Sequence, residues 1–205
     1  MIKKIAFALV LSAALPSMAE NYAGFVNVGG AIPDGLFREV VTNAVPGSVP
    51  ISPRFFAEDK IDIAALIAEA AKGVPNGERK LSVYFVNSKD FPPQISVPKR
   101  FAVINVRGLD KGADPKLYEL RILKMALKGF AFACGFGANQ DVGRCVMATG
   151  SFDTLKGIDA TSASYSPFCY FPMTDYLQSI GLIYYPPEEE VEEEPVEAQK
   201  KGDKK

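Results

Sequence analysis

A long amphipathic helix predicted over residues 114–134 is the feature that most limits what this chain can fold into. Asp114 is a suitable N-cap residue, and Pro115 follows at the first helical position. Gly135 and Gly137 then end the helix. One face of the predicted helix is apolar and consists of Leu120, Leu123, Leu127, Phe130, Ala131 and Cys134.

Two segments before this helix, 80–87 and 100–107, are rich in β-branched and aromatic residues and are predicted to be strands. A proline-containing loop, 91–98, is expected between them. Strands that alternate with helices favour a layered α/β domain. Further helices are expected over 34–44, with Asp34 as N-cap, over 61–72, ending at Gly73, and near 174–180; a proline-rich connector follows the first, and turns are expected elsewhere after Gly137.

Both ends of the chain differ from the middle. Residues 1–19 combine Lys3 and Lys4, a short apolar run and Ala19, which predicts a signal peptide and an exported protein, periplasmic or extracellular. Residues 186–205 hold 7 Glu and 1 Asp against 4 Lys, which predicts a disordered charged tail. The domain is therefore expected over 20–185. The chain carries −1, the tail −4 and the first segment +2, so the domain carries +1, which argues against nucleic-acid binding.

Histidine is absent from all 205 residues. This excludes Ser-His-Asp and Cys-His catalysis, and it excludes any zinc site with an imidazole ligand. The chain also has 3 cysteines, an odd number, so at least one of them has no partner within the chain.

The segment from Arg121 onward, RILKMALKGFAFACGFGANQDVGRCVMATGSFDTLKGID, is followed by Phe168-Cys169. It resembles the zinc-site region of the archaemetzincins, a metzincin family of metallopeptidases whose helix carries the motif HExxHxxGxxH. The resemblance covers roughly residues 80–172. It implies a single metzincin-like α/β domain with a mixed sheet, a long former active-site helix and a loop-rich C-terminal part.

The residues that perform the family's chemistry are replaced. The first zinc-binding His corresponds to Lys128, the general-base Glu to Gly129, the second His to Phe132 and the third to Ala138. Gly135 matches the turn glycine, Met147 the methionine of the Met-turn, and Asp159 an acidic position beyond it. Phe132 and Ala138 offer no donor atom to a metal, so the resemblance implies no zinc, no cofactor and no catalytic residue.

The cysteines of the family's second zinc site are also only partly conserved in this chain's matching positions. Of the four cysteines of the family's second zinc site, Cys145 and Cys169 match, whereas Asn139 and Pro172 occupy the other two positions. The resemblance places the two matching sulfurs close together. In an oxidising compartment a disulfide between them is the expected replacement. Cys134 would remain a buried free thiol.

These residues favour an exported, catalytically inactive peptidase homologue that binds a peptide or protein in the former substrate cleft. The ligand is expected along the strand residues Ala102, Val103, Ile104, Asn105 and Val106, taken as an exposed edge. Phe132 and Phe136 are candidates for plugging that cleft. One alternative is an active hydrolase whose site is rebuilt from Asp141, Asp153 and Asp159. Another is a structural, envelope-associated protein that makes contact through its acidic tail.

Overall fold

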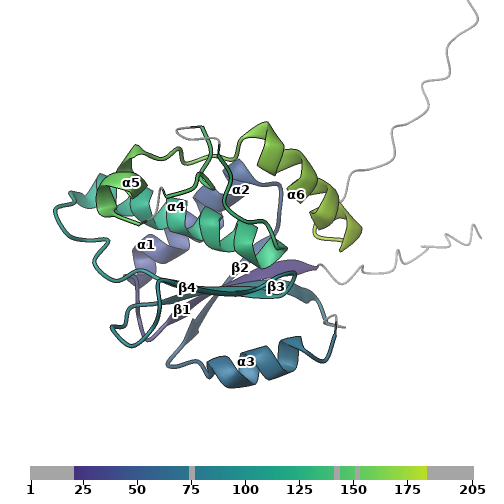
Figure 1. The fold of residues 1–205 in the computed structure, drawn as a ribbon. Helices are drawn as coiled ribbons and strands as arrows, with labels where there is room; N and C mark the ends of the chain where they lie inside the picture. Colours follow the sequence, from purple (N-terminus) through teal and green to yellow (C-terminus); the bar gives the residue numbers. More distant parts are fainter. Residues whose placement is uncertain (1–20, 74–76, 141–143, 151–152, 184–205) are drawn as a thin grey trace, which may run out of the picture.

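The sheet has five strands in the order β2-β1-β3-β5-β4 (Figure 1). Strands β1 (Tyr22–Val28), β2 (Pro53–Glu58), β3 (Arg79–Val86) and β5 (Phe101–Asn105) run parallel, and β4 (Gln94–Val97) pairs antiparallel with β5. The computed structural model describes residues 21–73, 77–140, 144–150 and 153–183. The expected signal peptide and the whole of the expected tail lie outside them.

Helices lie on both faces of the sheet (Figure 1). The upper face carries α1 (Asp34–Glu39), which continues through the π-helical turn η1 (Val40–Ala44) into α2 (Val45–Ser48). It also carries α4 (Pro115–Cys134), α5 (Leu155–Ala160) and α6 (Pro167–Ser179). The lower face carries α3 (Ile63–Ala70). The predicted α/β architecture with a mixed sheet and one long helix is confirmed.

Burial follows these layers. In β1, Phe25 points into the upper core, where its ring packs on Phe130 of α4 with centroids 6.0 Å apart. Val26 points to the lower face, into a smaller core between the sheet and α3. Helix α3 itself has no fully buried residue, so the lower face is covered far more lightly than the upper one. No helix among the described residues has both the length and the apolar character needed to cross a bilayer.

Helix α4 begins and ends as the sequence predicts. The Asp114 carboxylate accepts a hydrogen bond of 2.9 Å from the Leu117 N–H, and Pro115 is the first helical residue. Gly135 ends the helix with φ of 94°, a left-handed conformation that glycine adopts without strain. A Cβ at position 135 would also lie 3.4 Å from the Cβ of Pro98.

Several local predictions are wrong. Asp34 is the first residue of α1 rather than its cap, and its carboxylate accepts a hydrogen bond of 3.0 Å from the Asn27 side chain. The segment predicted as the loop 91–98 contains strand β4, and the C-terminal helix begins at Pro167, earlier than expected. Strands β1 and β2 and helix α5 were not predicted at all.

Candidate functional site

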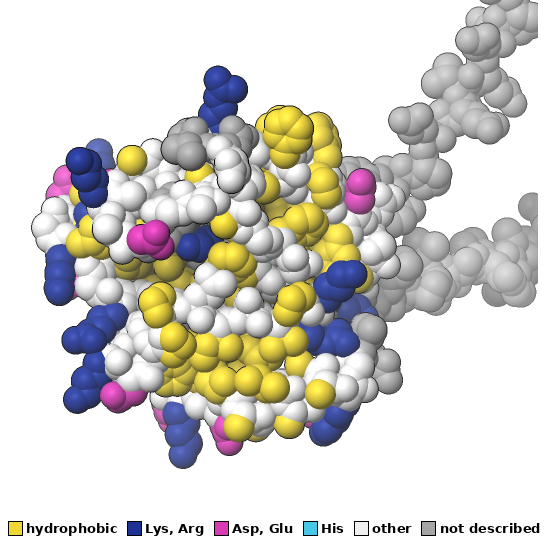
Figure 2. Space-filling model, in the orientation of Figure 1, with side chains coloured by type: hydrophobic (Ala, Val, Ile, Leu, Met, Phe, Trp, Pro, Cys, Tyr) yellow, Lys and Arg dark blue, Asp and Glu magenta, His cyan; other side chains and the backbone are white. Residues whose placement is uncertain are grey.

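A cavity of about 330 Å³ opens between α4 on one side and the ends of β4 and β5 on the other. Its walls include Gln94, Asn105, Met125, Lys128, Asp153 and Ile158. In Figure 2 a hollow separates the upper helical layer from the lower half of the molecule, and a basic side chain is recessed in it beside an acidic one. We refer to this cavity as the cleft.

Of the four positions matched to the family's zinc ligands and general base, only Lys128 lines the cleft. Its ammonium nitrogen lies 5.4 Å from the centre of the Phe132 ring. Burial lowers the pKa of Lys128 to about 8, and the nearby Asp153 carboxylate partly opposes this shift. The cleft thus contains a poorly solvated cation where the resemblance places the first zinc ligand.

Gly129, the position of the general-base Glu, faces the sheet. A Cβ at this position would lie 2.7 Å from Cγ1 of Val83 and 2.8 Å from Cγ1 of Ile104, closer than side-chain atoms approach in proteins. Helix α4 therefore sits on β3 and β5 with no space for a side chain here. Gly129 is fully buried and is not among the residues of the cleft wall.

The remaining matched positions are separated. Phe132 is partly buried and packs against the upper core, and Ala138 is exposed in the loop that follows α4. Met147 is buried in the core, and its carbonyl accepts a hydrogen bond of 2.8 Å from the Asn139 N–H. Phe132, Phe136 and Ala138 do not line the cleft. The donor atoms present at the family's catalytic positions therefore do not fit a zinc ion.

The predicted peptide-binding strand is not an edge. Strand β5, which holds Ala102 to Asn105, is paired on both sides, with β3 and with β4. Of the predicted residues only Ile104 and Asn105 line the cleft. The short strand β4 occupies the edge instead, because the segment before β5 folds back through a turn at Lys99, where φ is 62°.

Strand β4 presents backbone groups outward. The Asn105 N–H donates to the Pro93 carbonyl at 3.0 Å, which marks these two residues as a hydrogen-bonded pair. Because such pairs alternate in an antiparallel ladder, Ile95 also bonds to β5, and the N–H and C=O of Gln94 and Ser96 face away from it. Among the described residues no strand pairs with this outer side.

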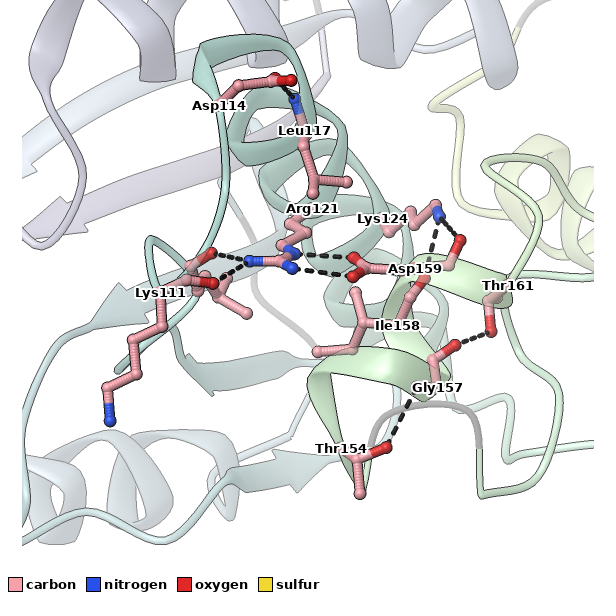
Figure 3. A network of polar contacts seen from close by, with 11 residues as sticks. Lys111, Asp114, Leu117, Arg121, Lys124, Thr154, Gly157, Ile158, Asp159 and Thr161 are labelled. Carbon is pink, nitrogen blue, oxygen red and sulfur yellow. Dashed lines mark hydrogen bonds and ion pairs between the residues drawn. The ribbon is translucent and has the colours of Figure 1, made fainter.

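A buried arginine, Arg121, is the centre of a network of polar contacts beside the cleft (Figure 3). The guanidinium of Arg121 donates two hydrogen bonds of 2.7 Å to the Asp159 carboxylate and others to the carbonyls of Leu109 and Lys111, at 2.6 and 2.9 Å. Lys124 donates to the carbonyls of Ile158 and Asp159. Both basic side chains come from α4. They fix α5 and the loop after β5, which form two walls of the cleft.

The sequence contains one signal for this network. Arg121 lies on the same helical face as Met125, Lys128 and Phe132. Charged residues on a face that packs inside a protein are buried only with partners. Asp159 is such a partner. The family resemblance marks position 159 as acidic, but it does not indicate that Arg121 binds this carboxylate.

The two matched cysteines are neighbours. The sulfurs of Cys145 and Cys169 lie 3.5 Å apart and are not bonded, and the Asn139 amide nitrogen lies 2.8 Å from Cys169 Sγ. Burial, with the adjacent Cys145, raises the pKa of the Cys169 thiol to about 11. Burial also acts to raise the pKa of Cys145, but hydrogen bonds from Ser166 and Met147 outweigh it and lower that pKa. The disulfide stays a prediction.

The carboxylates of the alternative hydrolase do not gather in the cleft. Asp141 lies outside the described residues, Asp153 lines the cleft, and Asp159 is bound to Arg121. Within the described parts of the chain, no three His, Cys, Asp or Glu side chains stand close enough to hold a metal ion.

The parallel sheet with one antiparallel edge strand, backed by a long helix that ends at a glycine, defines a metzincin-like α/β fold. Two solved archaemetzincin structures share it. The archaemetzincin (AmzA) from Methanopyrus kandleri matches with a TM-score of 0.58 and 19% identity, over 80% of this chain and 99% of that one. The archaemetzincin from Archaeoglobus fulgidus, complexed with malonate, matches with a TM-score of 0.51 and 17% identity, over 72% of this chain and 97% of that one.

These comparisons confirm the predicted resemblance at the level of the fold. At such identities the likeness shows the fold alone. Neither the comparison with protein-family models nor the comparison with curated proteins finds a match in sequence.

Proposed function

We propose that this protein is an exported pseudopeptidase that binds an extended peptide in its cleft without cleaving it by zinc chemistry. The observation that carries the proposal is the edge strand β4, which borders the cleft through Gln94 and directs backbone groups away from the sheet. A peptide added to β4 would continue the sheet through main-chain hydrogen bonds. Its side chains would alternate between the cleft and solvent.

The lining of the cleft supports binding rather than hydrolysis. Met125 and Ile158 give it an apolar wall, and Lys128 with Asp153 gives it polar groups of both signs. Hydrolysis of a peptide bond needs an activated water and a group that removes its proton. Position 129 has no side chain to do so, and Phe132 has no atom that binds a metal.

The experiment compares peptide binding by mature protein, residues 20–205, and by variants of Gln94. Ligands are selected from a library of extended decapeptides and their affinities measured by fluorescence anisotropy. Gln94→Pro removes an outward N–H that β5 does not use, so the sheet survives and the affinity is expected to fall about tenfold. Gln94→Ala retains the N–H and is expected to stay within about twofold of wild type.

Two results would contradict the proposal. Equal affinities for wild type and Gln94→Pro would show that the peptide does not add to β4. Zinc-dependent cleavage of the selected peptides, measured by mass spectrometry with and without added zinc, would show that the protein is an active peptidase. Loss of partner binding on deletion of residues 186–205, with peptide binding intact, would favour the envelope-associated alternative.

A further inference from the structure

A second cavity, of about 440 Å³, lies on the opposite face of the sheet, between the end of α3 and the beginnings of β3 and β5. Leu66 and Phe101 are part of its apolar lining. Its cationic lining consists of Lys72, Arg79, Lys80 and Arg100, against one acidic residue, Glu69, a net charge of +3. In Figure 2 basic side chains flank the apolar surface at the right of the lower half of the molecule. We call this cavity the basic pocket.

A β-bulge places Arg79 in the basic pocket. In the pairing of β1 with β3, Tyr22 is opposite Arg79 but Ala23 is opposite Leu81, so Lys80 is an extra residue. The bulge reverses the side on which Arg79 would otherwise project, and its side chain joins Ser82 on the lower face. Without the bulge, Arg79 would share the upper face with Leu81.

A glycine makes room for this side chain. A Cβ on Gly24 of β1 would lie 2.5 Å from Nε of Arg79, so the guanidinium crosses bare backbone at this point. The carbon of the guanidinium lies 5.0 Å from the centre of the Phe56 ring and 5.6 Å from that of Tyr84. The Arg79 guanidinium therefore lies against the sheet, over the backbone of Gly24 and beside two aromatic rings.

Hydrogen bonds fix the orientation of Arg79 but use few of its donors. Its Nε donates to the Ser82 hydroxyl at 2.8 Å, and Nη2 donates to the Tyr84 hydroxyl at 3.3 Å. A guanidinium has five N–H donors, so these contacts occupy two of them. Arg100 on the other wall is anchored in the same way, through the carbonyls of Ala70 and Lys99.

We propose that the basic pocket binds a phosphate monoester carried on an apolar or aromatic body. Guanidinium groups match phosphate oxygens in geometry, and a net lining charge of +3 suits a group that carries about two negative charges better than a single carboxylate. Leu66 and Phe101 supply the surface for the apolar body. The pocket lies across the sheet from α4, so this ligand is independent of the peptide proposed for the cleft.

The test measures binding of phenyl phosphate, inorganic phosphate and phenol to the mature protein by isothermal titration calorimetry. Phenyl phosphate is expected to bind more tightly than inorganic phosphate, and phenol to give no heat. Arg79→Gln is expected to weaken phenyl phosphate binding about tenfold or more. Gly24→Ala is expected to do the same through displacement of Arg79, with circular dichroism showing that the fold is retained.

Arg54→Gln is the matched control. Arg54 lies over the Tyr22 ring, 4.1 Å from its centre, and is outside the basic pocket, so its loss is expected to change the affinity less than about twofold. Equal losses of phenyl phosphate affinity in Arg54→Gln and Arg79→Gln would show that only the overall charge of the protein matters, and would overturn the proposal. So would binding to vesicles containing phosphatidic acid without binding of phenyl phosphate, which would assign the site to a membrane surface.

Discussion

The guanidinium of Arg121 and the carboxylate of Asp159 meet in two parallel hydrogen bonds of 2.7 Å, although the residues are 38 positions apart in the chain. The Arg121 side chain is 4% exposed and that of Asp159 33%. Hydrogen bonding by Arg121 lowers the pKa of Asp159, so the pair stays ionised well into acid. This contact ties α5 to α4 and so fixes two parts of the cleft wall relative to each other, Met125 of α4 and Ile158 of α5.

Replacement of Arg121 should therefore lower the stability of the folded protein. Arg121→Met leaves a partly buried carboxylate without its partner and is expected to lower the free energy of unfolding at pH 7 by about 2–4 kcal/mol. Urea unfolding measures this. Lys72→Met, which breaks an exposed pair with Glu69, is the control and is expected to cost under about 1 kcal/mol.

The same pair predicts a pH dependence. Because the pKa of Asp159 is lowered by folding from its ordinary value of 3.8, its stabilising contribution is present above pH 3.8 and is lost as the pH falls through the folded pKa. The difference in the free energy of unfolding between wild type and Arg121→Met should therefore become smaller below pH 3.8. A difference that stays constant from pH 6 to pH 2 would show that the ion pair is not its source.

Gly129 gives a second prediction. Gly129→Ala inserts a methyl group between α4 and the side chains of Val83 and Ile104, and should destabilise the protein by about 1–3 kcal/mol in spite of alanine's higher helix propensity. Gly35→Ala in α1 meets no atom within 4 Å and should instead stabilise by about 0.5–1 kcal/mol. Thermal and urea unfolding of both variants would check the pair. The prediction requires that the two substitutions change the free energy of unfolding in opposite directions.

Lys128 gives a third. Burial lowers its pKa to about 8 from an ordinary value of 10.5, so folding opposes its charged form. Between these two values the unfolded chain binds more protons than the folded one, so this residue's contribution to stability rises with pH and its penalty is greatest below pH 8. Lys128→Met should therefore be more stable than wild type at pH 7, by a margin that shrinks towards pH 10.5.

The pKa of Lys128 can also be measured directly, by NMR titration of the ¹³C-methylated amine. A value near 10.5 would show that the side chain is fully solvated. Asp153→Asn should lower the pKa further, since the carboxylate favours the charged lysine.

The cysteine pair gives a fourth. In oxidised protein comprising residues 20–205 we expect Cys145 and Cys169 to be bonded, which closes a loop of about 25 residues and adds on the order of 3 kcal/mol. Alkylation under denaturing, non-reducing conditions, followed by intact-mass analysis, should modify one thiol, that of Cys134. Three modified thiols would disprove the disulfide, and the reduced protein supplies the three-thiol reference.

Metal content gives a fifth. Elemental mass spectrometry of residues 20–205, after dialysis without chelator, should find zinc well below one equivalent. Treatment with EDTA should leave the unfolding temperature unchanged, since Phe132 and Ala138 have no donor atom and Lys128 is mostly protonated at pH 7. A full equivalent of a transition metal that EDTA removes with loss of stability would reveal a site built from other groups.

The elements with strong local signals were predictable from the sequence. Helix α4 has an N-cap, a proline at N1 and a closing glycine. Strand β3 ends in the apolar run Val83–Val86 and β5 begins with the apolar run Phe101–Ile104, and such runs are typical of buried parallel strands. Strands β1, β2 and β4 have weaker signals. A glycine interrupts β1, a proline begins β2, and β4 has only four residues between two prolines. Their formation depends on pairing with neighbours that are distant in the chain.

For the site, the sequence identified some of the residues but not their surroundings in the folded protein. The sequence locates Lys128, but its environment depends on Asp153, which the segment just before α5 brings to the cleft from another part of the chain. The edge was assigned to the wrong strand, because pairing by β4 cannot be read from the residues of β5. The binding between Arg121 and Asp159 likewise depends on the packing of two helices.

The contact between α4 and the sheet at Gly129 has a bearing on how the chain could change over time. A glycine at this position lets the helix pack directly on β3 and β5. Any larger residue would place a side chain against Val83 and Ile104, which already occupy that space. A carboxylate could be accommodated here only after the helix had moved or both neighbours had become smaller. Position 129 is therefore closed to an acidic side chain as long as these neighbours are unchanged.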